Sequence, residues 1–180
     1  MRSIVLCGFM GCGKTNIGKL LSEKLGFRFI DTDDYVKEMA GISIHDMLIE
    51  GRLSDVRKFE HEAVLRLSEL SDTVIATGGG VLIKDENGRA FHEKCFIVYL
   101  RRNFDTVYPV ISQDPVRVIA YKKPYDELKK LHDDRIPLYG KYADITVAND
   151  GCAEDTADEI LRSYYASAAE TVNTQTLRIE

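Results

Sequence analysis

The stretch Gly8-Phe9-Met10-Gly11-Cys12-Gly13-Lys14-Thr15 decides the fold. It matches the pattern G-x-x-x-x-G-K-[ST] of a phosphate-binding loop (P-loop), which connects a β-strand to a helix. The apolar run Ser3–Cys7 before it predicts the strand, and Ile17, Leu20 and Leu21 after it have helical spacing. Glycines let such a loop turn its N–H groups inward, and the helix N-terminus adds a partial positive charge. The sequence therefore predicts a site for the phosphates of a nucleoside triphosphate.

Individual residues of the P-loop have separate predicted tasks. The Lys14 ammonium can reach the β- and γ-phosphates, and the Thr15 hydroxyl can ligate Mg²⁺. We interpret Cys12 as a small residue that fills a position in the loop rather than as a redox centre. The residues expected to contact the nucleotide are Gly11, Cys12, Gly13, Lys14, Thr15 and Asn16.

Short apolar runs alternate with helical patterns along the rest of the chain. Further strands are predicted over Arg28–Asp31, Thr73–Thr77, Cys95–Leu100 and Asp144–Ala148, and a long amphipathic helix between residues 56 and 70. Strands that are apolar on both faces and alternate with helices are typical of a parallel sheet covered by helices. The predicted fold class is α/β.

Composition limits the possible partners. The 180 residues are 44% hydrophobic and 29% charged, as in a globular protein, and we expect one domain over residues 1–165. The net charge of −5 argues against a broad nucleic-acid surface. No apolar run approaches the ~20 residues of a membrane span, and four cysteines without metal-ligand spacing indicate reduced thiols. We expect a cytoplasmic protein without membrane or nucleic-acid partners, and a flexible tail over residues 166–180, where the sequence is polar and weakly periodic.

Two carboxylates follow the second predicted strand. Asp31 and Asp33 are two positions apart, and residues i and i+2 of a strand face the same way. Ligands of parallel sheets gather at the carboxyl ends of the strands. One carboxylate near the magnesium ion and one that accepts a proton from an attacking hydroxyl would suit phosphoryl transfer. The alternative is that these acids stabilise the start of the helix that contains Tyr35.

Three consecutive glycines follow the third predicted strand. Gly78, Gly79 and Gly80 would lie at the carboxyl edge of the sheet. A turn needs only one glycine, whereas three let a ligand approach the backbone closely. We therefore expect a ligand contact at this turn.

Three arginines are candidates for binding an anionic substrate. Arg135 continues the apolar stripe of Leu128 and Leu131, and a guanidinium on such a face needs a partner such as a carboxylate. Arg57 begins the amphipathic helix region, and Arg117 lies in a predicted loop, which suits a lid that closes over phosphates. The alternatives are internal salt bridges for Arg57 and Arg135, and a solvated surface position for Arg117.

The type of P-loop protein follows from motifs that the sequence lacks. It has no Asn/Thr-Lys-x-Asp motif of the kind that guanine-nucleotide switches use to read the base, and no apolar strand that ends in Asp-Glu, as in larger ATPases. The sequence therefore favours a kinase for a small molecule.

Taken together, these residues resemble the shikimate kinases over nearly the whole chain, from Ile4 to Leu161. Four further motifs accompany the P-loop in the family's order: Phe29–Asp33 (Phe-x-Asp-x-Asp), Arg57 with Glu60 (Arg-x-x-Glu), Gly78–Gly80, and Arg135–Tyr139 (Arg-x-Pro-Leu-Tyr). The P-loop alone occurs in many enzymes, so the specificity of the resemblance comes from the combination.

The resemblance implies a P-loop kinase fold of three layers, with a five-stranded parallel sheet of order 2-3-1-4-5, a substrate-binding segment at about 33–61 and a lid at about 112–124. It implies transfer of the γ-phosphate of ATP to the 3-hydroxyl of shikimate, with Mg²⁺, by a monomer that acts in chorismate and aromatic amino acid biosynthesis. The catalytic residues would be Lys14, Asp33 and Arg117. Shikimate would contact Asp33, Arg57, Gly78, Gly79, Gly80 and Arg135, and the metal site would involve Thr15 and Asp31.

The sequence departs from the family pattern at three places. The segment Gly51–Arg57 is one residue longer than usual, and Arg117-Val118-Ile119-Ala120 lacks the proline of the family's lid. Val110 falls where the family commonly has an arginine that packs on adenine, and we expect Pro109 to interrupt the helix after Leu100. These departures predict a raised KM for ATP. A kinase for another polyol acid, such as gluconate, and a weakened relative that acts as an interaction module remain alternatives.

Overall fold

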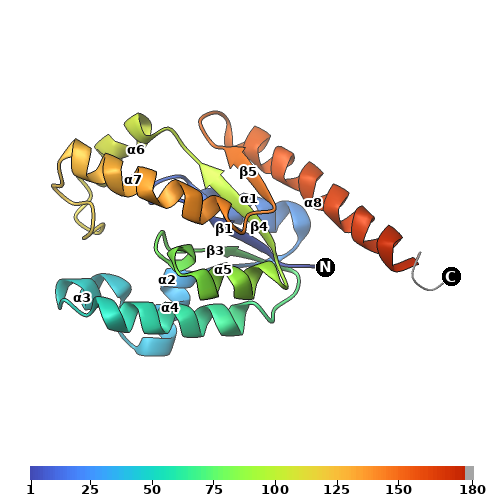
Figure 1. Ribbon diagram of the computed structural model, residues 1–180, viewed down its shortest axis with the longest axis horizontal. Helices are drawn as coiled ribbons and strands as arrows, with labels where there is room; N and C mark the ends of the chain where they lie inside the picture. The colour runs from blue at the N-terminus through green and yellow to red at the C-terminus, as the bar shows by residue number, and fades with distance from the viewer. Residues whose placement is uncertain (177–180) are drawn as a thin grey trace.

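Five parallel strands form the central sheet in the order β2-β3-β1-β4-β5 (Figure 1). In the computed structural model, which describes residues 1–176 with side chains to residue 169, the strands are β1 (Ile4–Cys7), β2 (Arg28–Asp31), β3 (Thr73–Ala76), β4 (Phe96–Arg101) and β5 (Ile145–Ala148). Every predicted strand is present, with each end within one residue of the prediction. The sheet order implied by the family resemblance is confirmed.

Helices cover both faces of this sheet. They are α1 (Lys14–Leu25), α2 (Thr32–Ala40), α3 (Ile44–Ile49), α4 (Leu53–Leu67), α5 (Asp85–His92), α6 (Phe104–Ile111), α7 (Tyr125–Gly140) and α8 (Ala153–Thr176). A short 3-10 turn, Val81–Ile83, precedes α5. No helix within the described residues is long and apolar enough to span a membrane.

Alternating side chains of each strand pack on opposite faces of the sheet. In β1, Ile4 and Leu6 belong to a buried cluster with α1 and α8, whereas Val5 and Cys7 belong to a larger cluster with α2 to α7. Figure 1 shows α8 and α4 on opposite sides of the sheet. A sheet buried on both faces explains why its strands read as continuous apolar runs.

Parallel pairing brings the carboxyl ends of the strands to one edge of the sheet. Cys7 is level with Tyr99, Asp31 with Ala76, and Arg101 with Ala148. The loops that follow all five strands therefore start from the same edge, as expected for a ligand site in an open parallel sheet.

Two sequence expectations about helices need correction. Pro109 does not interrupt α6, which runs from Phe104 to Ile111. The proline removes one hydrogen bond, but Asn103 caps the helix start, and buried Phe104 and Ile111 anchor it. The tail expected from Ala166 is also wrong for residues 166–176, which continue α8; alanine favours helix. Residues 177–180 lie outside the described residues.

Candidate active site

The P-loop between β1 and α1 has the backbone of a phosphate cradle. Gly13 has a φ of +98°, and a side chain there would place its Cβ 2.4 Å from Asn149 Nδ2, so only glycine fits. The Lys14 ammonium donates hydrogen bonds to the carbonyl oxygens of Gly8 at 2.8 Å and Phe9 at 2.9 Å. Lys14 therefore lies along the loop, where a phosphate would meet it.

A cleft of about 650 Å³ opens in front of this loop. Residues from the P-loop, β2, α2, α4, the glycine turn, the lid and α7 line it. The predicted site residues in its lining are Gly11, Gly13, Lys14, Thr15, Asn16, Asp31, Asp33, Arg57, Gly78, Gly79, Gly80, Arg117 and Arg135. The structure therefore brings together all predicted site residues except Cys12.

Cys12 lies behind the loop rather than in the cleft. Its side chain is 1% exposed, and its thiol lies 3.6 Å from Lys14 Nζ. Its N–H donates to Phe9 O, and its carbonyl accepts from Asn149 Nδ2. Cys12 is thus a buried spacer of the loop, as its small size suggested. All four cysteines are free thiols.

Asp31 links the end of β2 to the P-loop. One carboxylate oxygen accepts a hydrogen bond from Thr15 Oγ1 at 3.0 Å, and the other accepts one from the N–H of Asp33 at 3.0 Å. The second contact caps α2. The helix-capping interpretation of this aspartate is confirmed. Its other oxygen contacts Thr15, the predicted magnesium ligand, and the role of Asp31 near magnesium stays a prediction.

The donor set around Thr15 and Asp31 fits Mg²⁺. A hydroxyl and a carboxylate are hard oxygen ligands, and Mg²⁺ in kinases takes only one or two protein ligands besides phosphates and water. Among the described residues, no cluster of three or more His, Cys, Asp or Glu side chains could hold a metal by itself. A magnesium ion at this place would therefore arrive with the nucleotide.

Asp33 reaches the cleft by a different route from the predicted one. The strand ends at Asp31, so the i,i+2 alternation of a strand does not apply; Asp33 lies in the first turn of α2. Its carboxylate faces Gly78, where an added Cβ would lie 2.5 Å from Oδ1. The side chain is exposed in the cleft, whose walls partly desolvate it. This desolvation, with Asp31 and Glu60 nearby, raises the pKa of Asp33 to about 6 against the opposing effect of Lys14.

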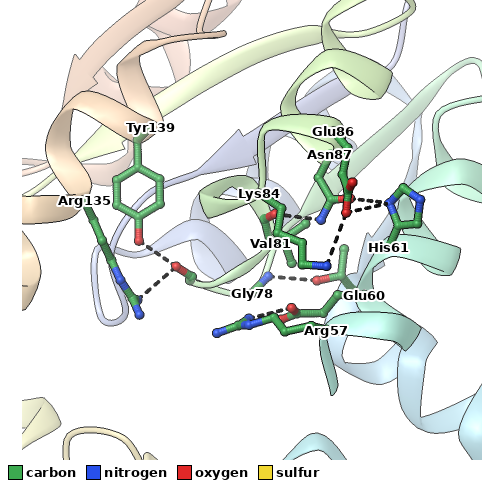
Figure 2. Close-up of polar contacts among 12 residues, drawn as sticks. Arg57, Glu60, His61, Gly78, Val81, Lys84, Glu86, Asn87, Arg135 and Tyr139 are labelled. Atoms are coloured by element: carbon green, nitrogen blue, oxygen red, sulfur yellow. Dashed lines mark hydrogen bonds and ion pairs between the residues drawn. The ribbon is translucent and has the colours of Figure 1, made fainter. Parts of the chain in front are cut away.

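The glycine turn lies between two arginines (Figure 2). Arg135 on α7 is 8% exposed and donates to Gly79 O at 3.2 Å, and Tyr139 Oη donates to the same oxygen at 2.6 Å. At Gly80, an added Cβ would lie 2.1 Å from Arg57 Nη1. The absence of side chains at the turn is therefore what allows the arginine contacts.

Arg57 is partly neutralised by a neighbour on the same helix. Its Nη1 donates to Glu60 Oε2 at 2.5 Å, and Glu60 is 4% exposed. Burial raises the pKa of Glu60, while Arg57 acts in the opposite direction. The predicted internal salt bridge of Arg57 is therefore present, and the guanidinium also lines the cleft. Glu60 accepts a hydrogen bond from one N–H group of the Arg57 guanidinium, and the other N–H groups can bind an anionic ligand.

The lid, residues 112–124, is a series of turns between α6 and α7. Arg117 lines the cleft, and its Nε donates to Asp114 Oδ2 at 3.1 Å. The Val116 carbonyl lies 3.1 Å from Nδ1 of His45 on α3. The predicted lid therefore contacts the predicted substrate-binding segment directly.

Sequence reasoning missed the side chains that hold the site from behind. Asn149, after β5, donates from Nδ2 to Cys12 O at 2.8 Å and accepts from Thr156 Oγ1. Thr32 Oγ1 accepts the N–H of Gly78 at 2.8 Å. These partners are far apart in the chain, so local patterns gave no signal for them; only the position of Asn149 at the end of a predicted strand placed it at the correct edge.

Comparisons with known proteins agree with this geometry. The family model "Shikimate kinase" matches residues 10–165. A shikimate kinase of Thermodesulfovibrio yellowstonii is 35% identical over 91% of this chain and 95% of its own, and one of Caldanaerobacter subterraneus subsp. tengcongensis is 37% identical over 91% and 96%. The solved structure of shikimate kinase from Acinetobacter baumannii in complex with shikimate has 29% identity and a TM-score of 0.86, and covers 93% of this chain and 94% of that one. The family model covers most of the chain, and both relatives are more than 30% identical over nearly their whole length, so this chain belongs to the shikimate kinase family.

Proposed function

We propose that this protein transfers the γ-phosphate of ATP to the 3-hydroxyl of shikimate, which gives shikimate 3-phosphate and ADP. Membership of the family makes the chain an ATP-dependent kinase. The observation that carries the substrate proposal is that one cleft holds the P-loop lysine, the Asp33 carboxylate and two arginines beside the glycine turn.

The shikimate carboxylate would bind between Arg57 and Arg135. Guanidinium groups recognise carboxylates through charge-assisted and often bidentate hydrogen bonds. Glu60 and the Gly79 carbonyl hold the two arginines in place from behind. The backbone of Gly79 and Gly80 would contact the ring because no side chain stands in the way.

The attacking hydroxyl would lie at Asp33. The carboxylate accepts the hydroxyl proton as the oxygen attacks the γ-phosphorus, and the bond from that phosphorus to the bridging oxygen of ADP breaks. Lys14 and Arg117 stabilise the negative charge on the transferred group. Thr15 and Asp31 would hold Mg²⁺, which supplies further charge neutralisation at the phosphates.

We also propose that the protein acts in the cytoplasm as a monomer. Its net charge of −5 argues against a nucleic-acid partner. Light scattering after size-exclusion chromatography tests the monomer.

The deciding experiment measures ADP release from MgATP with shikimate, gluconate, quinate or no acceptor. We expect turnover only with shikimate. Turnover with gluconate instead would support the kinase site but show that the substrate is another polyol acid. Binding of ATP without turnover on any acceptor would favour a weakened relative that acts as an interaction module.

Lys14→Met tests the role of the P-loop, and Lys19→Met is its matched control. Loss of a cation that faces the developing charge should lower kcat by at least roughly 10²–10³-fold. Lys19→Met removes an exposed lysine from the same helix, outside the cleft, and should leave kcat unchanged. Equal turnover in the two variants would contradict the role of the P-loop.

A further inference from the structure

Arg102 carries a guanidinium that nothing in the described part of the chain satisfies. It follows β4 directly and lines the cleft. Its Nε is buried and has no hydrogen-bond partner, and no ion pair of Arg102 is present among the described residues. A buried N–H without a partner is unfavourable, so contacts within the fold do not explain the arginine at this position.

The backbone around Arg102 is held on both sides. The N–H of Asn149 donates to Arg101 O at 2.7 Å, and the N–H of Asn103 donates to Asp150 Oδ1 at 2.8 Å. Asn149 also bonds the P-loop carbonyl of Cys12. The chain at Arg102 is therefore fixed relative to the P-loop, as a preorganised ligand contact requires.

The position of Arg102 indicates which part of the nucleotide it meets. The phosphates belong at Lys14, and the acceptor belongs at the arginines of the glycine turn. The rest of the nucleotide must then extend toward the remaining side of the P-loop. That side is formed by α6, because an added Cβ at Gly11 would lie 2.9 Å from side-chain atoms of both Val107 and Ile111. Val110 of the same helix also lines the cleft and is 62% exposed.

A flat aromatic group is the ligand that fits these two side chains. A guanidinium plane stacks on aromatic rings and attracts them electrostatically. An exposed valine offers an apolar contact without a hydrogen bond. The phosphates already have the N–H groups of the loop and Lys14.

We propose that Arg102 binds the purine base of the nucleotide by stacking on its face. The proposal rests on the proposed function for the presence of a nucleotide in the cleft. It means that Arg102, and not a residue at position 110, determines base affinity, so the KM for ATP is not raised by Val110.

The test measures the dissociation constants of MgADP and of magnesium pyrophosphate by calorimetry. Arg102→Ala should weaken ADP binding roughly tenfold and leave pyrophosphate binding unchanged. Arg102→Lys keeps the charge but loses the plane, and should also weaken ADP. Arg101→Ala is the matched control, because Arg101 is exposed and outside the cleft lining. The melting temperature of Arg102→Ala should be equal to or above that of the wild type.

Each outcome decides the proposal. Equal weakening of ADP and pyrophosphate by Arg102→Ala would make Arg102 a phosphate contact and overturn the base assignment. Unchanged ADP binding would overturn any role in the nucleotide site. Failure of the proposed function looks different, because the wild type would then bind ADP with the same dependence on Arg102 but would not phosphorylate shikimate.

Discussion

Asp33 is the residue whose surroundings matter most for the chemistry of the cleft. Desolvation has the largest effect on its pKa, followed by the carboxylates of Asp31 and Glu60, and together they raise the pKa from 3.8 to about 6 despite Lys14. A general base is most useful when its pKa lies near the working pH. The same environment that positions Asp33 therefore also adapts it to accept a proton.

Asp33→Asn should lower kcat by roughly 10²–10⁴-fold, because an amide cannot accept the hydroxyl proton. In the wild type the carboxylate form prevails only above pH 6, so kcat/KM for shikimate should fall as the pH drops through about 6. The variant should lack this acid limb. Asp34→Asn, on the same helical turn, is the control and should keep it. If Asp33→Asn raised the KM for shikimate and left kcat unchanged, Asp33 would be a binding residue only.

The raised pKa of Asp33 also has a consequence for stability. Both folded and unfolded states carry the proton below pH 3.8, and the unfolded state ionises first as the pH rises. Asp33 therefore lowers the free energy of unfolding progressively between about pH 3.8 and 6, and the loss persists above pH 6. Asp33→Asn should match the wild-type melting temperature near pH 3.5 and exceed it at pH 7.5. Equal melting temperatures at both pH values would contradict the raised pKa.

The turn after β3 is the element that makes the substrate side of the cleft. Gly80→Ala would place a methyl group 2.1 Å from Arg57 Nη1, so the guanidinium must move. We expect a KM for shikimate raised roughly tenfold or more, since a displacement of about 1 Å at a binding group can cost 10²-fold, with the KM for ATP unchanged. Gly140→Ala is the control, because an added Cβ there meets no atom within 4 Å. Equal KM values for shikimate in both variants would show that Arg57 does not bind it.

The elements also differ in how far their sequence predicts them. Strands such as β1 and β3 follow from apolar runs, because a sheet buried on both faces demands them. The start of α2 at Thr32 does not follow from the sequence pattern, since Asp31 caps the helix with a side chain that could also have continued the strand. Pro109 looked like a helix end, but the buried side chains of α6 outweigh one lost hydrogen bond.

For the molecule as a whole, long-range contacts decide what local patterns cannot. The P-loop motif predicted Lys14 and Thr15, and parallel pairing explains why Asp31 and the glycine turn meet them at one edge of the sheet. Asn149, which follows β5, supports the P-loop through a hydrogen bond to Cys12 O. Arg102, which follows β4, has a buried Nε without a partner. These contacts have no local pattern, and only the folded chain reveals them.

The predicted lid and the predicted substrate-binding segment are in contact. His45 on α3 lies 3.1 Å from the carbonyl of Val116, which precedes Arg117 in the lid. A ligand that draws the substrate-binding segment inward therefore also holds the lid over the nucleotide, and the effect must be reciprocal.

We expect saturating shikimate to increase the affinity for ADP, and His45→Ala to reduce this increase by roughly 2- to 10-fold, the value of one hydrogen bond. His92→Ala removes an equivalent contact to Tyr142 O, also 3.1 Å long, away from the cleft, and should leave the increase intact. Calorimetric titration of ADP with and without shikimate measures the increase in affinity. If His45→Ala showed the same increase as the wild type, the lid would close independently of α3.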